Sequence, residues 1–190
     1  MQFIDVVKQL NIQLFLIENA KSLNEYAKID LSEETLTKLK INPANHQELQ
    51  LYLSKIQHNK NVKVLYGGYL EKRNLYANSA LFNSNENRNI HLGLDFWADA
   101  GTGIVAPLNG IVQSAYYNEG EGNYGGTIIL KHQFKDFSFF SLYGHLSKAS
   151  LSVKINSQIQ KGDVFCYLGE THENGNYVPH LHFQWILDLP

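Results

Sequence analysis

This chain of 190 residues contains a single cysteine and no surplus of positive charge. Because Cys166 is alone, an internal disulfide, a cysteine-rich zinc module and a CxxC redox pair are excluded. Lysine and arginine number 16 against 18 aspartate and glutamate, which gives a formal net charge of −2. No basic surplus is therefore available to neutralise a run of phosphates, and we expect no nucleic-acid partner.

Long hydrophobic runs are also missing. The longest nearly apolar stretch, residues 14–17, is far shorter than the ~20 residues of a membrane-spanning helix. The N-terminus lacks the basic region that precedes the apolar part of a signal peptide. We therefore expect no membrane partner and a cytoplasmic location, unless the chain is part of a longer protein. The sequence does not indicate an oligomeric state.

The chain divides by pattern near residue 60. Hydrophobic residues make up 44% of it, enough for one sizeable core. Capping residues and apolar spacings of three and four predict a helix over Glu34–Lys40 and another from Ala44 to about Gln57. We also expect helical structure over about residues 3–28. Residues 1–60 are thus predicted to form a helical N-terminal segment.

Residues 61–190 show a different pattern, with short β-rich runs separated by glycine. The runs lie at 62–66, 110–117, 126–130, 137–143, 164–168 and 182–186. No helical pattern lies between them, so the fold class is mainly β, a compact antiparallel β-sandwich or open barrel. The glycine-rich stretch 120–126 lacks the lysine of a phosphate-binding loop and is expected at the rim of a groove.

The histidines are the residues most suited to chemistry. Near the C-terminus, alternation along a strand places His180 and His182 on one face, so that one can bind a metal while the other stands beside it. His91 and Asp95 are four residues apart, and Gly93 between them could allow the backbone to bend. Two histidines and one aspartate would make a three-ligand site with a free fourth position, as in catalytic zinc sites.

His145 ends another β-rich run, whose alternation groups it with Tyr143. If it reaches the same cleft, it is suited to proton transfer or to hydrogen bonding an oxyanion. Simpler interpretations exist, because two histidines on one strand are usually a solvated pair and a His-x-x-x-Asp spacing usually marks a turn. Residue patterns alone leave these alternatives open.

Four motifs in order cover about residues 88–187. They are His91-Leu-Gly-Leu-Asp95, residues 101–107 with 110–112, Tyr143-Gly-His-Leu146 and Pro179-His-Leu-His-Phe183. Together they resemble the lysostaphin/LytM-type zinc metallopeptidases, a family of bacterial murein endopeptidases. The resemblance implies that His91, Asp95 and His182 bind Zn²⁺ and that His145 and His180 are the catalytic pair. It also implies a compact antiparallel β-structure with a groove over the metal.

A closer similarity is to the peptidase-like domain of long bacterial proteins, where it lies between a kinase-like phosphotransferase domain and a class III aminotransferase domain. Residues 127–132 and 172–175 carry that similarity. That subgroup also lacks a secretion signal, and a cytoplasmic enzyme would not meet the mature cell wall. The expected partner is a peptide substrate, either of peptidoglycan type or rich in glycine.

The sequence therefore predicts a zinc-dependent endopeptidase that hydrolyses peptide bonds with a zinc-activated water. No HExxH motif supplies a glutamate base, so His180 or His145 would remove the proton and the other would stabilise the oxyanion. The alternative is a non-catalytic zinc-binding or regulatory module of a larger assembly. All five candidate residues are intact, which favours the enzyme.

One hypothesis, less favoured than its alternative, is that residues 1–60 pack on the β-domain and restrict its groove. The apolar stripes of these helices must be buried, and the polar stretch 83–89 could bring the segment near His91. The alternative is that the stripes pack on each other or on the far side of the sheet.

Overall fold

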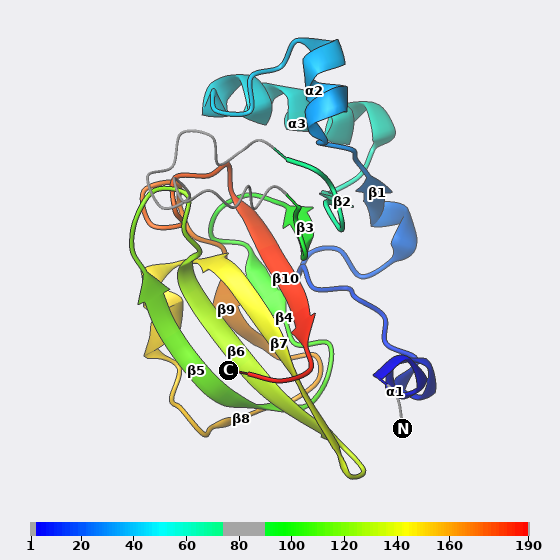
Figure 1. Ribbon diagram of the computed structural model, residues 1–190, viewed down its shortest axis with the longest axis vertical. Helices are drawn as coiled ribbons and strands as arrows, with labels where there is room; N and C mark the ends of the chain where they lie inside the picture. Colours follow the sequence, from blue (N-terminus) through cyan, green and yellow to red (C-terminus); the bar gives the residue numbers. More distant parts are fainter. Residues whose placement is uncertain (1–2, 74–89, 190) are drawn as a thin grey trace.

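The computed structural model describes residues 3–73 and 90–189, in which ten strands and three α-helices are ordered along the chain (Figure 1). The helices are α1 (Phe3–Leu10), α2 (Glu33–Leu39) and α3 (His46–Lys60), with short 3₁₀ helices η1 (Leu23–Glu25) and η3 (Lys148–Ser152). The strands are β1 (Tyr26–Lys28), β2 (Val64–Gly67), β3 (Leu94–Trp97), β4 (Gly103–Val105), β5 (Gly110–Asn118), β6 (Gly125–Phe134), β7 (Phe137–Leu146), β8 (Gln158–Ile159), β9 (Val164–Tyr167) and β10 (His180–Ile186).

The strands form one large sheet and one small one. The large sheet has eight strands in the order β1-β2-β3-β10-β7-β6-β5-β8, and β4 pairs with β9 in the small one. Every described pairing is antiparallel except that of β1 with β2. The mainly β fold class is confirmed, and each of the six predicted β-rich runs overlaps a strand.

The two sheets enclose the main hydrophobic core. Figure 1 shows β4 and β9 behind the large sheet, and their buried Ile104 and Cys166 belong to the same cluster as Tyr143 of β7 and Leu181 of β10. Cys166 is fully buried, and burial raises the pKa of its thiol. The small sheet thus covers one face of the large one, in the manner of a sandwich.

The first 28 residues are less helical than expected. After α1, the backbone runs beside β4, where Glu18 N–H donates to Gly103 O and Val105 N–H donates to Leu16 O. Leu16 and Ile17 are buried in the main core, and the chain then forms η1 and β1. The expectation of helix over residues 3–28 is therefore wrong for most of the stretch beyond Leu10, because residues 16–18 are held extended by hydrogen bonds to β4 and residues 26–28 form β1.

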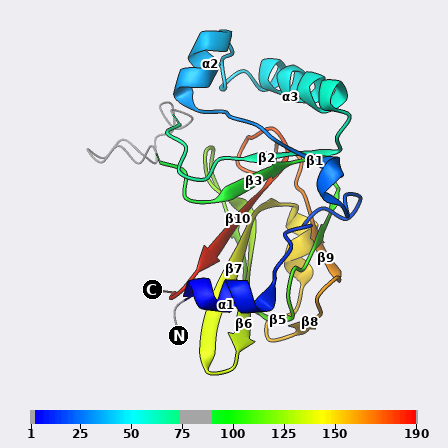
Figure 2. The same ribbon diagram turned by 90° about the vertical axis from the view of Figure 1, so that its right-hand side faces the viewer.

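Helices α2 and α3 pack against one end of the large sheet, and α1 lies at the other end (Figures 1 and 2). Leu36 of α2 and Leu53 of α3 form a second buried cluster with Leu65 of β2 and Trp97 of β3. The apolar stripes of these helices are thus covered by the β-strands. The division of the chain into domains at residue 60 stays a prediction. None of the described helices has the length and apolar character needed to cross a membrane.

His132 does not lie on the surface, where a histidine after a predicted strand end would be expected. Strand β6 continues to Phe134, so His132 lies within it and is 2% exposed, stacked on Phe139. Its Nδ1 donates to Asn109 O, and its Nε2 lies 2.6 Å from Ser141 Oγ. Burial lowers its pKa, and the residue is a satisfied part of the core.

The packing of α3 on the sheet predicts a large loss of stability for Leu53→Ala. Leu53 is 1% exposed, whereas Leu51 on the same helix is 72% exposed. Truncating a buried leucine removes apolar contacts and leaves a cavity, so we expect a loss of about 2–5 kcal/mol in the free energy of unfolding. Leu51→Ala should stay within about 0.5 kcal/mol of the parent protein. Urea denaturation measures both, and equal effects would contradict this packing.

Candidate metal centre

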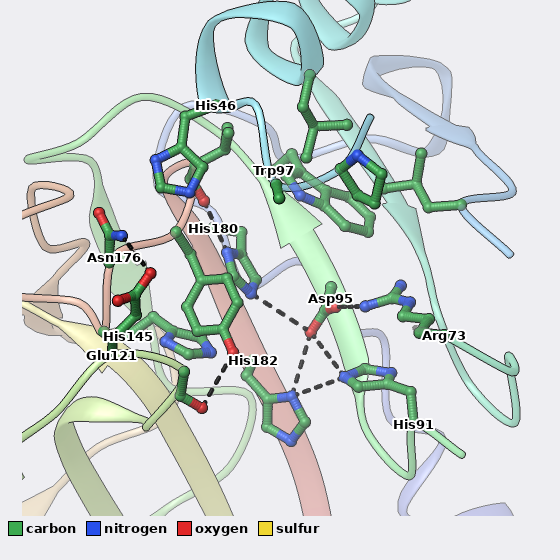
Figure 3. A pocket seen from close by; sticks show the side chains of 18 of the residues that line it. His46, Arg73, His91, Asp95, Trp97, Glu121, His145, Asn176, His180 and His182 are labelled. Carbon is green, nitrogen blue, oxygen red and sulfur yellow. Dashed lines mark hydrogen bonds and ion pairs between the residues drawn. The ribbon is translucent and has the colours of Figure 1, made fainter. Parts of the chain in front are cut away.

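His91, Asp95 and His182 converge on one buried point (Figure 3). The register of β10 on β3 pairs His182 with Asp95 across the sheet. Asp95 Oδ1 lies 3.2 Å from His91 Nε2 and 3.2 Å from His182 Nδ1, and these two nitrogens are 2.9 Å apart. Ligand atoms around one tetrahedral zinc lie about 3.4 Å apart, given bonds of ~2.1 Å. The three residues predicted as metal ligands are therefore placed at distances that suit one ion.

Gly93 is needed between His91 and Asp95. The chain bends at Gly93 before β3 begins, as the spacing of the two ligands requires. A Cβ at this position would lie 2.3 Å from Cε1 of the His182 ring. The absence of a side chain thus lets the His182 ring approach the backbone beside the other two ligands.

Backbone carbonyls fix which nitrogen of each histidine faces the site. Nδ1 of His91 lies 2.8 Å from Gly68 O, that of His145 2.7 Å from Asn174 O, and that of His180 2.8 Å from Val178 O. A carbonyl oxygen only accepts, so each Nδ1 carries a proton and Nε2 is the nitrogen left to face the cluster. His182 is different, because its Nδ1 faces the cluster and its buried Nε2 has no hydrogen-bond partner among the described residues.

Asp95 is charged despite being fully buried. Burial alone would raise its pKa, but Arg73 and the facing histidines outweigh that effect and hold the pKa of the carboxyl well below its usual range. Arg73 Nη1 lies 2.5 Å from Asp95 Oδ2, the oxygen turned away from the histidines. No sequence pattern indicates Arg73, because this residue lies outside any strand or helix and outside the four motifs.

His145 reaches the cluster through an unusual backbone conformation. Tyr143 pairs with Phe183 on the core face of the sheet, and strict alternation would bring His145 to that same face. His145 instead has a φ of 62°, a left-handed conformation that costs a non-glycine residue about 1–3 kcal/mol. The expected grouping with Tyr143 is therefore wrong. This turn places the His145 ring centroid 4.3 Å from that of His180.

The two further histidines are buried and neutral. Burial lowers the pKa of His180 to about 4, although Asp95 opposes the shift. Burial, followed by the neighbouring His180 and His182, holds the pKa of His145 well below its usual range. His180 Nε2 lies 3.9 Å from Asp95 Oδ1. Both rings therefore present proton-accepting nitrogens beside the candidate metal position.

A pocket of about 180 Å³ opens onto these residues. Two loops form one wall, held together by hydrogen bonds from Asn176 Nδ2 to Glu121 Oε1 and from Tyr177 Oη to Gly122 O. Residues 121–124 thus line the pocket where the sequence indicated a groove rim. His172 is exposed and does not line this pocket, whereas Asn174 of the same loop orients His145.

The opposite wall comes from the N-terminal segment. Its residues in the pocket lining are Leu31, Leu36, Pro43, Ala44, His46 and Leu49. His46, the first residue of α3, lies above His180 in Figure 3, although a histidine in a helical appendage would be expected in solvent. The stretch 83–89, which was expected to bring the segment near His91, lies outside the described residues.

The donor set fits a zinc ion. Two neutral imidazole nitrogens and one carboxylate oxygen are ligand types of catalytic zinc, and a three-ligand set leaves a position open. With neutral histidines, the three groups carry one negative charge, so a divalent cation would leave a net charge of +1. Such a centre suits hydrolysis, since positive charge favours a hydroxide nucleophile and a developing oxyanion.

Comparison with known proteins finds one matching family and several similar proteins. Residues 89–188 match peptidase family M23. Lysostaphin of Staphylococcus staphylolyticus is 35% identical over 103 residues, which cover 54% of this chain and 20% of that protein. Peptidoglycan DD-endopeptidase ShyC of Vibrio cholerae is 30% identical over 98 residues, covering 52% of this chain and 20% of that protein. The chain thus spans about a fifth of the length of these curated relatives.

Solved structures of similar proteins include the catalytic domain of lysostaphin from Staphylococcus simulans. It has 27% sequence identity and a TM-score of 0.45, covering 70% of this chain and 87% of that chain. A zinc-containing peptidase from Vibrio cholerae has 23% identity and a TM-score of 0.43, covering 54% of this chain and 32% of that chain.

The geometry predicts that Asp95→Ala and His182→Ala no longer retain zinc. Changing a residue that only supports a ligand typically weakens metal affinity 10–100-fold, so losing one ligand of three should cost at least about 100-fold. Asp99→Ala is the matched control, because Asp99 is exposed and lies just beyond β3. Metal analysis of dialysed protein gives the zinc content, and full retention in both ligand variants would contradict this ligand set.

Proposed function

The chain belongs to peptidase family M23, and from this membership and the geometry of the buried cluster we propose that it is a zinc-dependent endopeptidase. The carrying observation is the convergence of Asp95 Oδ1 with His91 Nε2 and His182 Nδ1. Zinc held by these atoms would supply Lewis-acid chemistry, polarising a carbonyl and lowering the pKa of water towards about 7. The remaining chemistry is the work of His180 and His145.

In this proposal, His180 and His145 divide the proton transfer and the stabilisation of the oxyanion. Both rings are neutral and present Nε2 towards the site, so either can accept a proton. His180 is the better placed to act as the base, because its Nε2 lies 3.9 Å from the Asp95 oxygen of the cluster. The proton that His180 takes from water can pass to Nε2 of His145, because the two ring centroids lie 4.3 Å apart. The protonated His145 would then donate a hydrogen bond to the negatively charged substrate oxygen.

The substrate that we propose is a peptide, either of peptidoglycan type or rich in glycine. One relative is named a peptidoglycan DD-endopeptidase and others DD-carboxypeptidase/endopeptidases. The walls of the pocket support a narrow substrate, because α3 and the stretch before it face the loop 121–124 across the site. The helical segment would thereby restrict which side chains can lie next to the bond that is cleaved.

A non-catalytic module would not need several features of this site. Such a module requires neither the tautomers that direct the Nε2 atoms of His180 and His145 into the pocket nor the left-handed turn at His145. The enzyme is therefore the favoured proposal. The kinship with the peptidase-like domain of phosphotransferase/aminotransferase fusion proteins and the cytoplasmic location stay predictions.

We expect His180→Ala and His145→Ala to keep zinc and to lose turnover. A positioned acid or base contributes about 10²–10⁴-fold to the rate, so each variant should lose at least about 100-fold in kcat. The assay uses zinc-loaded protein and short peptides that include Gly-Gly and D-amino-acid bonds. His58→Ala is the control, because His58 is exposed on α3. A variant within about twofold of the parent rate would remove that histidine from the proposed mechanism.

The helical wall predicts a change in side-chain preference when its residues are altered. Ala44→Trp should narrow the pocket and lower kcat/KM most for peptides with a bulky residue beside the cleaved bond, by about 10-fold or more. His46→Ala should widen the pocket and favour those same peptides.

Gln47→Ala serves as the control for both variants, since Gln47 is exposed and outside the pocket lining. The measurement is the ratio of kcat/KM for bulky and small peptides. Deleting residues 1–60 is a poorer test, because Leu16 and Ile17 belong to the main core. An unchanged ratio in both wall variants would show that the substrate does not contact this wall.

A further inference from the structure

Arg73 is a buried cation directly behind the candidate metal centre. Its side chain is 3% exposed, and Nη1 lies 2.5 Å from Asp95 Oδ2. Nε donates to Glu71 Oε2 at 2.9 Å, and the guanidinium lies over the Trp97 ring at 5.6 Å. The guanidinium therefore contacts Asp95, Glu71 and Trp97, and Oδ2 of Asp95 accepts its hydrogen bond.

We propose that Glu71 and Arg73 position Asp95 as a one-oxygen metal ligand. Oδ2 is occupied by Arg73, so Oδ1 is the only oxygen left to face His91 and His182. This rests on the proposed function, since it assumes that a metal binds at the cluster. Arg73 is thus a positioning residue, which acts on the metal through its hydrogen bond to Asp95.

The turn that carries Arg73 also orients a second ligand. Gly68 O accepts the hydrogen bond from His91 Nδ1, and backbone hydrogen bonds join Leu70 and Glu71 to His91. Gly68 has a φ of 101°, and a Cβ there would lie 2.5 Å from Arg73 Nη2 and 2.8 Å from His91 Nδ1. Residues 68–73 therefore form one support that fixes the orientation of both His91 and Asp95.

Because Arg73 is positively charged, a purely electrostatic role and an orienting role predict opposite changes in metal affinity when the residue is removed. A positive charge near a cation site opposes metal binding, so removing it should strengthen binding if charge were all that mattered. Glu71 offsets that charge, being paired with Arg73 through Oε2 at 2.9 Å. If the role of Arg73 is to orient the carboxylate, its removal should instead weaken binding. The sign of the change therefore decides between the two roles.

The test compares Arg73→Met and Arg73→Lys with the control Lys72→Met. Lys72 is exposed and adjacent, so its loss removes a charge from the same turn without touching Asp95. Zinc affinity is measured by competition with a chelator, and ligand geometry by the visible absorption of the cobalt-substituted protein. We expect zinc affinity to fall about 10–100-fold in Arg73→Met, with an altered cobalt spectrum, and to be unchanged in Lys72→Met.

Arg73→Lys keeps the charge but loses the planar fork, so it isolates orientation from charge. We expect an intermediate loss of affinity, and this variant decides alone if Arg73→Met fails to fold. Equal or tighter zinc binding with an unchanged cobalt spectrum would overturn the proposal. If the parent protein itself binds no zinc, the proposed function fails instead, so the two failures are distinguishable.

Discussion

The pairing of His182 with Asp95 across β10 and β3 is the constraint on which the site depends. It places a nitrogen and a carboxylate oxygen 3.2 Å apart, and the same register places Leu181 and Phe183 in the main core. A slip of one residue would exchange the two faces of β10, moving the histidines into the core and the apolar residues into the pocket. The hydrophobic core therefore fixes the geometry of the candidate metal centre.

Alternation in the sequence was enough to predict that part of the site. His180 and His182 share one face of β10 because a strand turns successive side chains to opposite faces, and the bend near Gly93 follows from the distance between His91 and Asp95. The mainly β class followed from the β-rich runs for the same reason. These features depend on the local alternation of residue types along the chain, which a sequence shows directly.

The features that the sequence could not predict depend on contacts between residues that follow no periodic spacing along the chain. His145 enters the site through a left-handed φ that strand alternation does not predict, and Arg73 enters it from a turn. Residues 16–20 were expected to be helical because their apolar content suits a helix as well as a buried extended stretch. Only the edge of β4, to which Leu16 and Glu18 hydrogen-bond, decides between the two, and that edge is distant in sequence.

The balance of buried charge explains why two residues, Glu71 and Arg73, support Asp95. A lone arginine beside the cluster would neutralise Asp95 and leave two neutral imidazoles with little attraction for a divalent cation. Glu71 restores one net negative charge to the group, while its bond to Arg73 Nε keeps the guanidinium aligned with Asp95 Oδ2. Burying three charges is costly unless each is hydrogen-bonded, and each of the three groups makes at least one hydrogen bond, although Nη2 of Arg73 has no hydrogen-bond partner among the described residues. The same pair of residues can therefore fix the direction of the carboxylate without removing the charge that attracts a metal.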